Sequence, residues 1–237
     1  MEALLLAGGK GERLGNAAHG RPKPLVDVAG VPLAAYAIAR FAEAGVERVV
    51  VACAAGQEGL FESELGGLGP EIVAVGEREP LGRGGGLRRA AAARVESGPV
   101  IAANGDEILD VDLNALLAVH RDRALAATIV VAPLPSAFGV VELTDDDAVV
   151  GFHEAGRLPH WVSAGLYVLE EEAIERLPER GDHETTSFPE LAAERRLAAF
   201  RHEGLWLTVN TPKDLRRAEE FLASRPDWRP APIGAAR

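Results

Sequence analysis

Short apolar runs alternate with longer segments of helical period along the first half of the chain. Four of these runs read as buried strands: EALLLAG (2–8), RVVVACA (48–54), EIVAV (71–75) and PVIAANGD (99–106). Three segments between and after these strands repeat apolar residues at helical spacing: 32–45, 86–96 and 110–123. This alternation is typical of a parallel sheet with helices on both faces. It predicts an α/β fold with a Rossmann-like, mixed but mainly parallel sheet flanked by helices.

The pattern changes after residue 124. Four apolar stretches follow one another with short turns between them, which predicts a mostly antiparallel continuation: 125–134, 139–144, 148–154 and 161–170. Three further helices are expected at 171–178, 187–196 and 211–224, the last with Thr211 as N-cap and Pro212 at its first position. We therefore expect one domain over residues 1–225 and a flexible Pro/Ala-rich tail at 226–237.

Composition excludes several classes of protein. A net charge of −11 argues against a general nucleic-acid partner. No run approaches the ~18 apolar residues of a membrane span, and the start MEALLLAGG lacks the basic residues of a signal peptide. The sequence thus predicts a soluble, cytoplasmic protein with no membrane partner, and it leaves a homo-oligomer open.

The loop after the first strand is unusually basic for this acidic chain. The chain has only three lysines, and two of them, Lys10 and Lys23, lie in AGGKGERLGNAAHGRPKPL with Arg13 between them. Glycines let backbone amides approach an anion closely. Lysine suits a phosphate as a compact point charge, and flanking prolines stiffen the backbone that presents Lys23. The loop alone fits neither the dinucleotide fingerprint nor the Walker pattern, but it predicts a phosphate site.

Six sequence elements in order carry a family resemblance. LAGGKGERL (6–14) with RPKPLVDVAGVPL (21–33) resembles the signature of the sugar-1-phosphate nucleotidylyltransferases, also called nucleoside-diphosphate-sugar pyrophosphorylases. The other five elements are similar to further motifs of that family: EPLGRGGGL (79–87), NGD (104–106), VGFHE (150–154), SAGLYVL (163–169) and GLWLTVNTPKDL (204–215). The resemblance extends over residues 4–215 and implies a fold of the nucleotide-diphospho-sugar transferase type.

The resemblance also implies a reaction and a set of site residues. The phosphate of a sugar 1-phosphate would attack the α-phosphorus of a nucleoside triphosphate, and pyrophosphate would leave. Arg13 would hold the β- and γ-phosphates, Lys23 would bridge the two reacting phosphates, and Asp106 would complete the catalytic set. Nucleotide contacts would come from two glycine-rich loops: Leu6, Ala7, Gly8, Gly9, Lys10 and Gly11 in the first, and Gly82 and Gly85 in the second. Sugar contacts would come from Gly139, Glu154, Ser163 and Gly165.

The chain departs from the family at two informative positions. Ala155 stands where the family has a lysine near the sugar phosphate, and Thr208 stands where it has a metal-binding aspartate. We therefore expect Mg²⁺ to be held by Asp106, with Asn210 as second ligand and Thr208 contributing at most through water.

Substrate identity stays open in the sequence. The expected substrates are GTP or UTP and a mannose- or glucose-type hexose 1-phosphate. The alternatives are a nucleotidylyltransferase that acts on a non-sugar or polyol phosphate, and a non-catalytic nucleotide-binding regulator. A dehydrogenase-type dinucleotide binder fits poorly, because the second strand ends in ACAAGQ without an acidic residue.

Overall fold

The structure is a computed structural model that describes residues 1–9, 11–136, 138–154, 156–225, 228 and 230. Three predictions made from the sequence therefore lie outside the described residues. They are the nucleotide contact at Lys10, the substitution at Ala155, and all but two residues of the tail at 226–237.

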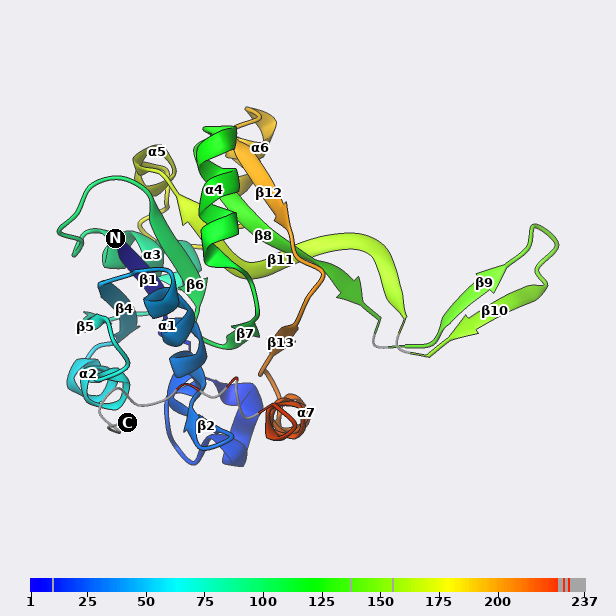
Figure 1. Cartoon of the computed structure of the whole chain (residues 1–237), viewed down its shortest axis with the longest axis horizontal. Helices are drawn as coiled ribbons and strands as arrows, with labels where there is room; N and C mark the ends of the chain where they lie inside the picture. Colours follow the sequence, from blue (N-terminus) through cyan, green and yellow to red (C-terminus); the bar gives the residue numbers. More distant parts are fainter. Residues whose placement is uncertain (10, 137, 155, 226–227, 229, 231–237) are drawn as a thin grey trace.

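A seven-stranded sheet forms the centre of the molecule, in the order β12-β8-β11-β6-β1-β4-β5 (Figure 1). Four neighbouring strands run parallel: β6 (Val100–Asn104), β1 (Glu2–Leu6), β4 (Arg48–Ala54) and β5 (Glu71–Glu77). The long strand β11 (Arg157–Leu169) is antiparallel to β6 and to β8 (Ala127–Pro135), and β12 (Leu197–Arg201) is parallel to β8. The predicted mixed, mainly parallel α/β sheet is confirmed.

Helices cover both faces of this sheet, as the alternation of apolar runs predicts. Ala3 and Leu5 of β1 belong to a core that includes α1 (Leu33–Glu43), α2 (Glu58–Leu65) and α4 (Leu113–Arg123). Leu4 belongs to the opposite core, with α3 (Gly82–Ala91), α5 (Glu171–Glu175) and α6 (Ser187–Ala193). Successive residues of one strand point to opposite faces, so a strand covered on both faces must be apolar throughout.

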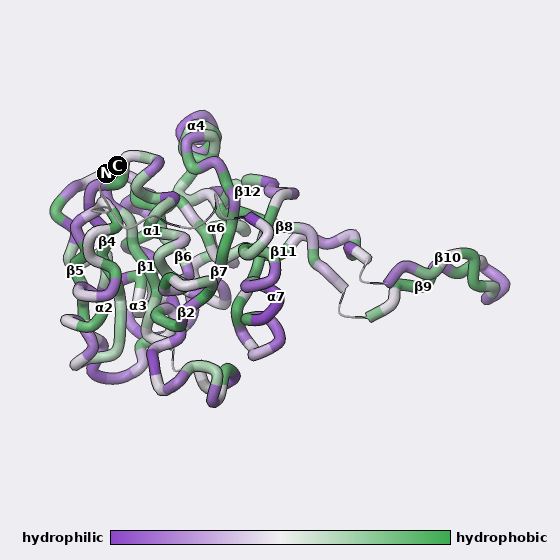
Figure 2. The backbone as a smooth tube through the Cα atoms, turned by 60° about the horizontal axis from the view of Figure 1, so that its bottom comes forward, coloured by the Kyte–Doolittle hydropathy of each residue, from purple (hydrophilic) through white to green (hydrophobic). Residues whose placement is uncertain are grey.

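Three two-stranded ladders and two short 3-10 helices complete the fold. The ladders are β2 (Asp27–Val28) with β3 (Val31–Pro32), β7 (Glu107–Leu109) with β13 (Trp206–Thr208), and β9 (Val140–Leu143) with β10 (Val149–His153). The 3-10 helices are η1 (Glu12–Ala18) and η2 (Lys23–Leu25). The β9–β10 hairpin projects away from the rest of the molecule, with apolar residues along its length (Figure 2).

The last helix, α7 (Pro212–Ala223), begins as the sequence predicts. Thr211 is its N-cap and forms a capping box with Asp214, and Pro212 occupies the first helical position. The capping box fixes the backbone that enters α7, and the preceding residue is Asn210.

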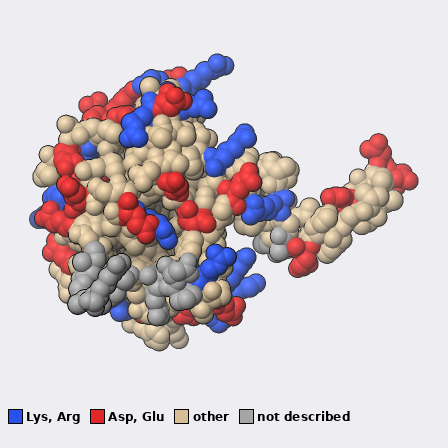
Figure 3. All heavy atoms as spheres, in the orientation of Figure 1, with Lys and Arg blue, Asp and Glu red and all other residues tan. Residues whose placement is uncertain are grey.

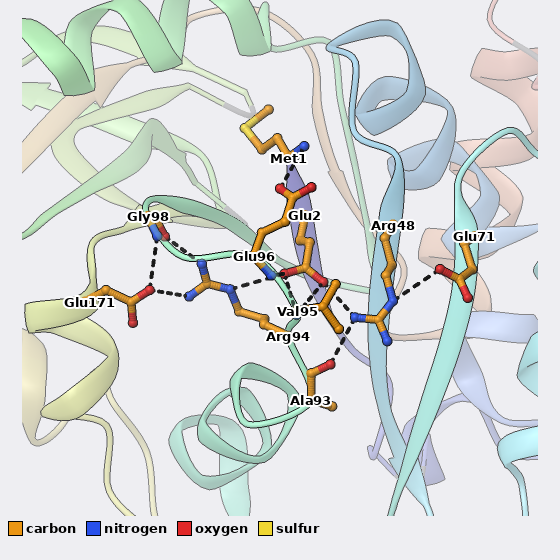
Figure 4. Close-up of polar contacts among 10 residues, drawn as sticks. All are labelled: Met1, Glu2, Arg48, Glu71, Ala93, Arg94, Val95, Glu96, Gly98 and Glu171. Carbon is orange, nitrogen blue, oxygen red and sulfur yellow. Dashed lines mark hydrogen bonds and ion pairs between the residues drawn. The ribbon is translucent and has the colours of Figure 1, made fainter.

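A buried acidic residue joins several elements at the N-terminal end of β1 (Figure 4). The Glu2 carboxylate accepts hydrogen bonds from Arg48 Nη1 at 2.7 Å and from the Val95 and Glu96 amides at 3.0 and 2.9 Å. Burial alone would raise the pKa of Glu2, but the Glu96 amide and the Arg48 guanidinium hold it below its ordinary value. This cluster ties β1 to β4 and to the segment before β6.

The surface carries acidic and basic side chains intermixed over the body (Figure 3). Among the described residues, no helix combines the length and the apolar character that crossing a membrane requires.

Candidate functional site

A cavity of about 650 Å³ opens at the carboxyl ends of β1, β5 and β6. Ligands of open α/β sheets bind at this edge, because the connecting loops converge there. Its lining comes from the connection after β1, the segment after β5, the turn after β6 and the residue before the N-cap of α7: Leu6, Ala7, Gly8, Gly9, Arg13, Lys23, Pro24, Glu77, Pro80, Gly82, Arg83, Asn104, Asp106, Glu107 and Asn210.

The loop after β1 forms the centre of the cavity. Leu6, Ala7, Gly8 and Gly9 line it. Gly11 serves a different purpose, because a Cβ there would lie 2.9 Å from the Cβ of Lys23 and its φ of 62° is left-handed. Gly11 therefore lets the loop pack closely against the segment that carries Lys23.

Four side chains from separate parts of the chain meet beside this loop. Lys23 Nζ donates to Asp106 Oδ2 at 2.5 Å and to Asn210 Oδ1 at 2.7 Å. Arg13 Nη2 donates to the same Asn210 oxygen at 3.1 Å. Lys23 is only 7% exposed, so its charge acts where water screens it weakly. The structure thus brings together the three predicted catalytic residues and the predicted second metal ligand.

Asp106 and Asn210 form a donor set that suits a hard cation. Their oxygens contact one and the same ammonium nitrogen, so a carboxylate and an amide oxygen converge on one point. Among the described residues, no group of three or more His, Cys, Asp or Glu side chains could hold a metal. Mg²⁺ commonly binds through one or two protein oxygens and completes its shell with water and phosphates, so the residues fit this ion. Thr208 does not line the cavity.

The second glycine-rich stretch is not the loop that the sequence suggests. Residues 82–86 form the first turn of α3, and only Gly82 of the two predicted nucleotide contacts lines the cavity. A Cβ on Gly85 would lie 2.6 Å from the Glu179 carbonyl oxygen, and one on Gly82 would lie 2.5 Å from that of Gly181. These glycines therefore let the segment 178–183 pack directly on α3, which is a sufficient structural reason for their presence.

The four predicted sugar contacts fall into two separated groups. Gly165 lies in β11 against the Asn104 amide and the Glu107 carboxylate, and its φ of 68° suits a glycine. Ser163, two residues earlier, has its hydroxyl 3.3 Å from that of Tyr167. Gly139 and Glu154 instead flank the strands of the projecting hairpin, and none of the four predicted sugar contacts is part of the cavity lining. The structure does not bring these two groups together.

Glu77 is a cavity residue that the sequence analysis missed. It ends β5, is buried, and accepts a hydrogen bond from the Leu81 amide at 3.1 Å. Burial raises the pKa of Glu77 despite that hydrogen bond. Its position at the carboxyl end of a predicted strand was the available signal, since that edge is where ligands bind.

Glu107 is a second missed acid, directly after Asp106. Its two carboxylate oxygens accept from Trp206 Nε1 at 2.7 Å and from Asn104 Nδ2 at 3.1 Å. Burial raises the pKa of Glu107 to about 7, and the neighbouring Asp106 adds to the effect. In the sheet order, Glu77 on β5 and Glu107 after β6 lie on opposite sides of the loop after β1.

Comparison with known proteins identifies the family of this chain. The family model described as nucleotidyl transferase matches residues 2–225. The mannose-1-phosphate guanylyltransferase of Mycobacterium tuberculosis is 33% identical over 233 residues, which cover 94% of this chain and 64% of that protein. The catalytic subunit beta of the same enzyme from Drosophila pseudoobscura is 31% identical over 90% of this chain and 60% of its own length.

The solved structure of HddC from Yersinia pseudotuberculosis shares the fold. Its TM-score is 0.72 at 23% identity, over 93% of this chain and 99% of that chain. This chain spans 60–64% of the length of the two relatives named above. The match of the family model over nearly the whole sequence shows that the chain belongs to the nucleotidyl transferase family, as its resemblance to the sugar-1-phosphate nucleotidylyltransferases predicts.

Proposed function

We propose that this protein transfers a guanylyl group from GTP to a mannose-type hexose 1-phosphate. A phosphate oxygen of the sugar phosphate attacks the α-phosphorus of GTP, the bond from that phosphorus to the oxygen bridging the β-phosphate breaks, and pyrophosphate leaves. The observation that carries the proposal is the convergence of Lys23, Arg13, Asp106 and Asn210 beside the glycine loop. Such a site needs no covalent intermediate, because positioning and charge neutralisation drive the reaction.

Arg13, Lys23 and Mg²⁺ have separate roles in this proposal. The backbone of Ala7, Gly8 and Gly9 approaches the triphosphate, and Arg13 lies at the rim, where it holds the departing phosphates. Lys23 is buried and acts where the attacking and attacked phosphates meet, so its charge offsets the negative charge that builds up there. Asp106 and Asn210 would hold Mg²⁺, which when bound supplies further positive charge against the triphosphate.

Glu77 favours guanine as the base. Its carboxylate is buried at the β5 side of the cavity, and its one hydrogen bond from the described residues comes from the Leu81 amide. A buried carboxylate with spare acceptor capacity is stabilised by a ligand that brings donors. Guanine presents two adjacent donors on one edge, N1–H and N2–H, whereas uracil offers only N3–H. The two relatives named above are guanylyltransferases by name, which supports the same base.

The sugar would then lie on the other side of the loop, beside Glu107. Asn104 and Glu107 both line the cavity, and both pack closely against Gly165, where a Cβ would clash with them. The Asn104 Oδ1 atom is buried and accepts no hydrogen bond from the described residues. Sugar hydroxyls are donors, so a carboxylate and an unpaired amide oxygen are suitable acceptors for them.

The base assignment is tested by replacing Glu77 with glutamine. Glutamine replaces one of the two carboxylate oxygens by an NH2 group, which would face one of the guanine donors instead of accepting from it. Two hydrogen bonds to a charged group are at stake, and a loss of about 3 kcal/mol predicts a fall in kcat/KM for GTP of roughly 150-fold. UTP should lose much less.

A nearby exposed acid provides the control. Glu79→Gln makes the same chemical change two residues away, on a side chain that does not line the cavity, and should leave the preference for GTP intact. An active Glu77→Gln variant that keeps the wild-type kcat/KM for GTP would contradict the assignment of the base.

A further inference from the structure

Arg83 is a charged cavity residue that the proposed mechanism does not use. It lies in the first turn of α3, it lines the cavity, and its side chain is 46% exposed. The next residue, Gly84, fixes the backbone: its amide donates to the Gly181 carbonyl at 2.9 Å, and a Cβ there would lie 2.8 Å from the His183 amide nitrogen. Arg83 therefore extends from a backbone that is held against the connection between α5 and α6.

Two carboxylates of that connection hold the Arg83 guanidinium. Nε donates to Asp182 Oδ2 at 2.7 Å, Nη2 contacts the same oxygen, and Nη1 lies 2.7 Å from Glu184 Oε2. Although burial alone would raise the pKa of Asp182, the Glu184 amide and the Arg83 guanidinium hold it below its ordinary value. Among the described residues, these contacts use three of the five N–H groups of a guanidinium, so one on Nη1 and one on Nη2 are left for a ligand.

A row of polar contacts joins this cluster to the wall where the sugar is proposed to lie. Glu184 Oε1 accepts from the Tyr167 hydroxyl at 3.2 Å, and that hydroxyl lies 3.3 Å from Ser163 Oγ. Ser163 Oγ in turn accepts from the Gly165 amide at 3.4 Å, and Gly165 packs against the two residues proposed above to bind the sugar. Arg83 thus belongs to the sugar side of the cavity, and Ser163, a predicted sugar contact outside the cavity lining, helps to position it.

The charges of the cluster do not cancel. One arginine faces two carboxylates, so Arg83, Asp182 and Glu184 together carry a formal charge of +1 − 2 = −1. A guanidinium that is already compensated still donates hydrogen bonds, but it brings no net positive charge to the cavity. A neutral hydroxyl oxygen therefore suits it, whereas an anionic group at the same place would meet two carboxylates.

We propose that Arg83 is a specificity-determining residue that donates to a hydroxyl oxygen of the acceptor sugar, and that Asp182 and Glu184 exclude acceptors with a carboxylate at that place. This role presupposes the proposed transfer to a hexose 1-phosphate, and it defines the acceptor as a neutral hexose 1-phosphate rather than a hexuronic acid 1-phosphate. A site built to bind a hydroxyl group discriminates strongly against an analogue that lacks it, because the donor is then left unpaired.

The first test pairs the removal of Arg83 with the removal of single hydroxyl groups from the acceptor. The quantity measured is kcat/KM of the wild type and of Arg83→Leu, with the hexose 1-phosphate that the wild type prefers and with its monodeoxy analogues. One analogue should be about tenfold poorer than the parent sugar for the wild type and equal to it for Arg83→Leu, since the hydroxyl and the guanidinium form one hydrogen bond. The KM for GTP should not change.

Arg180→Leu is the matched control for this test. Arg180 belongs to the same connection, pairs with Glu79, is exposed and does not line the cavity, so its removal should leave the discrimination among analogues unchanged. A folded, active Arg83→Leu enzyme that discriminates as the wild type does would overturn the role of Arg83 and leave the proposed function intact. A wild type that uses no hexose 1-phosphate would refute the proposed function and this role together.

The second test keeps Arg83 and changes the charge around it. Glu184→Gln preserves the size of the side chain and one acceptor oxygen, but it brings the formal charge of the cluster from −1 to 0. The wild type should use a hexuronic acid 1-phosphate roughly 100-fold less well than the corresponding hexose 1-phosphate, because a third carboxylate enters the cluster. Glu184→Gln should reduce that ratio of kcat/KM values about tenfold.

Glu179→Gln is the control for charge. It removes one negative charge from an exposed side chain of the same connection that does not line the cavity, and it should leave the ratio as in the wild type. A wild type that uses both acceptors equally well, or a Glu184→Gln enzyme with the wild-type ratio, would show that these carboxylates do not select against an anionic acceptor.

Discussion

Replacing Lys23 by alanine is the sharpest perturbation of the proposed site. Lys23 Nζ is the only described atom that contacts both Asp106 and Asn210, and the residue is 7% exposed. Its ammonium therefore acts in a poorly hydrated place and needs little reorganisation to meet a developing charge. Removal of the side chain leaves the Asp106 carboxylate without its nearest cation.

The expected loss follows from the cost of deleting one preorganised donor. Such deletions raise the activation barrier by about 3 kcal/mol, and each ~1.36 kcal/mol corresponds to a factor of ten. We therefore expect kcat of Lys23→Ala to fall roughly 150-fold. Binding of GTP should weaken far less, because Arg13 and the glycine loop remain in place. Lys23→Arg should also have a low kcat. The segment is already crowded against Gly11, and the planar guanidinium of arginine does not replace the compact ammonium of lysine.

The assay separates turnover from binding. Pyrophosphate release at saturating substrates gives kcat, and calorimetry with GTP alone gives the dissociation constant. Lys213→Ala is the matched control, since it removes an exposed lysine of α7 outside the cavity and should leave both quantities unchanged. A folded Lys23→Ala enzyme with kcat within threefold of the wild type would refute the role given to this lysine.

Three further predictions concern the metal, the sugar and the fold. Asn210→Ala should raise the Mg²⁺ concentration needed for half-maximal GTP binding, whereas Thr208→Val should not; the opposite ranking in a magnesium titration would show that Thr208 is the ligand. Glu107→Gln should raise KM for the sugar phosphate about tenfold, with KM for GTP unchanged; equal changes in both would indicate a purely structural role. Because the pKa of Glu2 is lowered on folding, its contribution to stability is present at neutral pH and is lost as the pH falls below its ordinary value of 4.5. The difference in unfolding free energy between wild type and Glu2→Gln should accordingly shrink from pH 7 to pH 3 in urea titrations, and a difference that stays constant would count against this linkage.

Much of the fold follows from patterns that act over a few residues. Strands covered on both faces must be apolar throughout, so β1, β4 and β6 can be recognised from their apolar runs in the sequence. The three-residue strands β7 and β13 are missed because they are too short to show a period. The strand β12, at the edge of the sheet, is missed as well, and only one of its five residues is buried. The start of α3 was placed too late because glycines have low helix propensity, whereas here they make room for the segment 178–183.

The sequence predicts site residues where a side chain suited to binding phosphate or metal also lies at the carboxyl edge of the parallel strands. Lys23 and Asp106 are 83 residues apart, but each lies in a connection at the carboxyl edge of the parallel strands, Lys23 in the short helix η2 and Asp106 in the turn after β6. Glu77 and Glu107 are missed because acidic residues are common on surfaces, and only the fold shows that Glu77 is buried and Glu107 half-buried in the cavity wall. The position of Glu154 on the projecting β9–β10 hairpin does not follow from the sequence either, because a local motif does not fix the direction in which a hairpin leaves the sheet.

Phosphorus NMR of the wild-type protein with GTP, mannose 1-phosphate and Mg²⁺ tests the proposed function most directly. The account predicts that the GTP and sugar-phosphate signals decline together while a nucleoside-diphosphate sugar and pyrophosphate appear in equal amounts. Without the sugar phosphate, the GTP signals should persist. Pyrophosphate that forms without an acceptor, or GTP that stays intact with mannose 1-phosphate and with every other hexose 1-phosphate supplied, would contradict it.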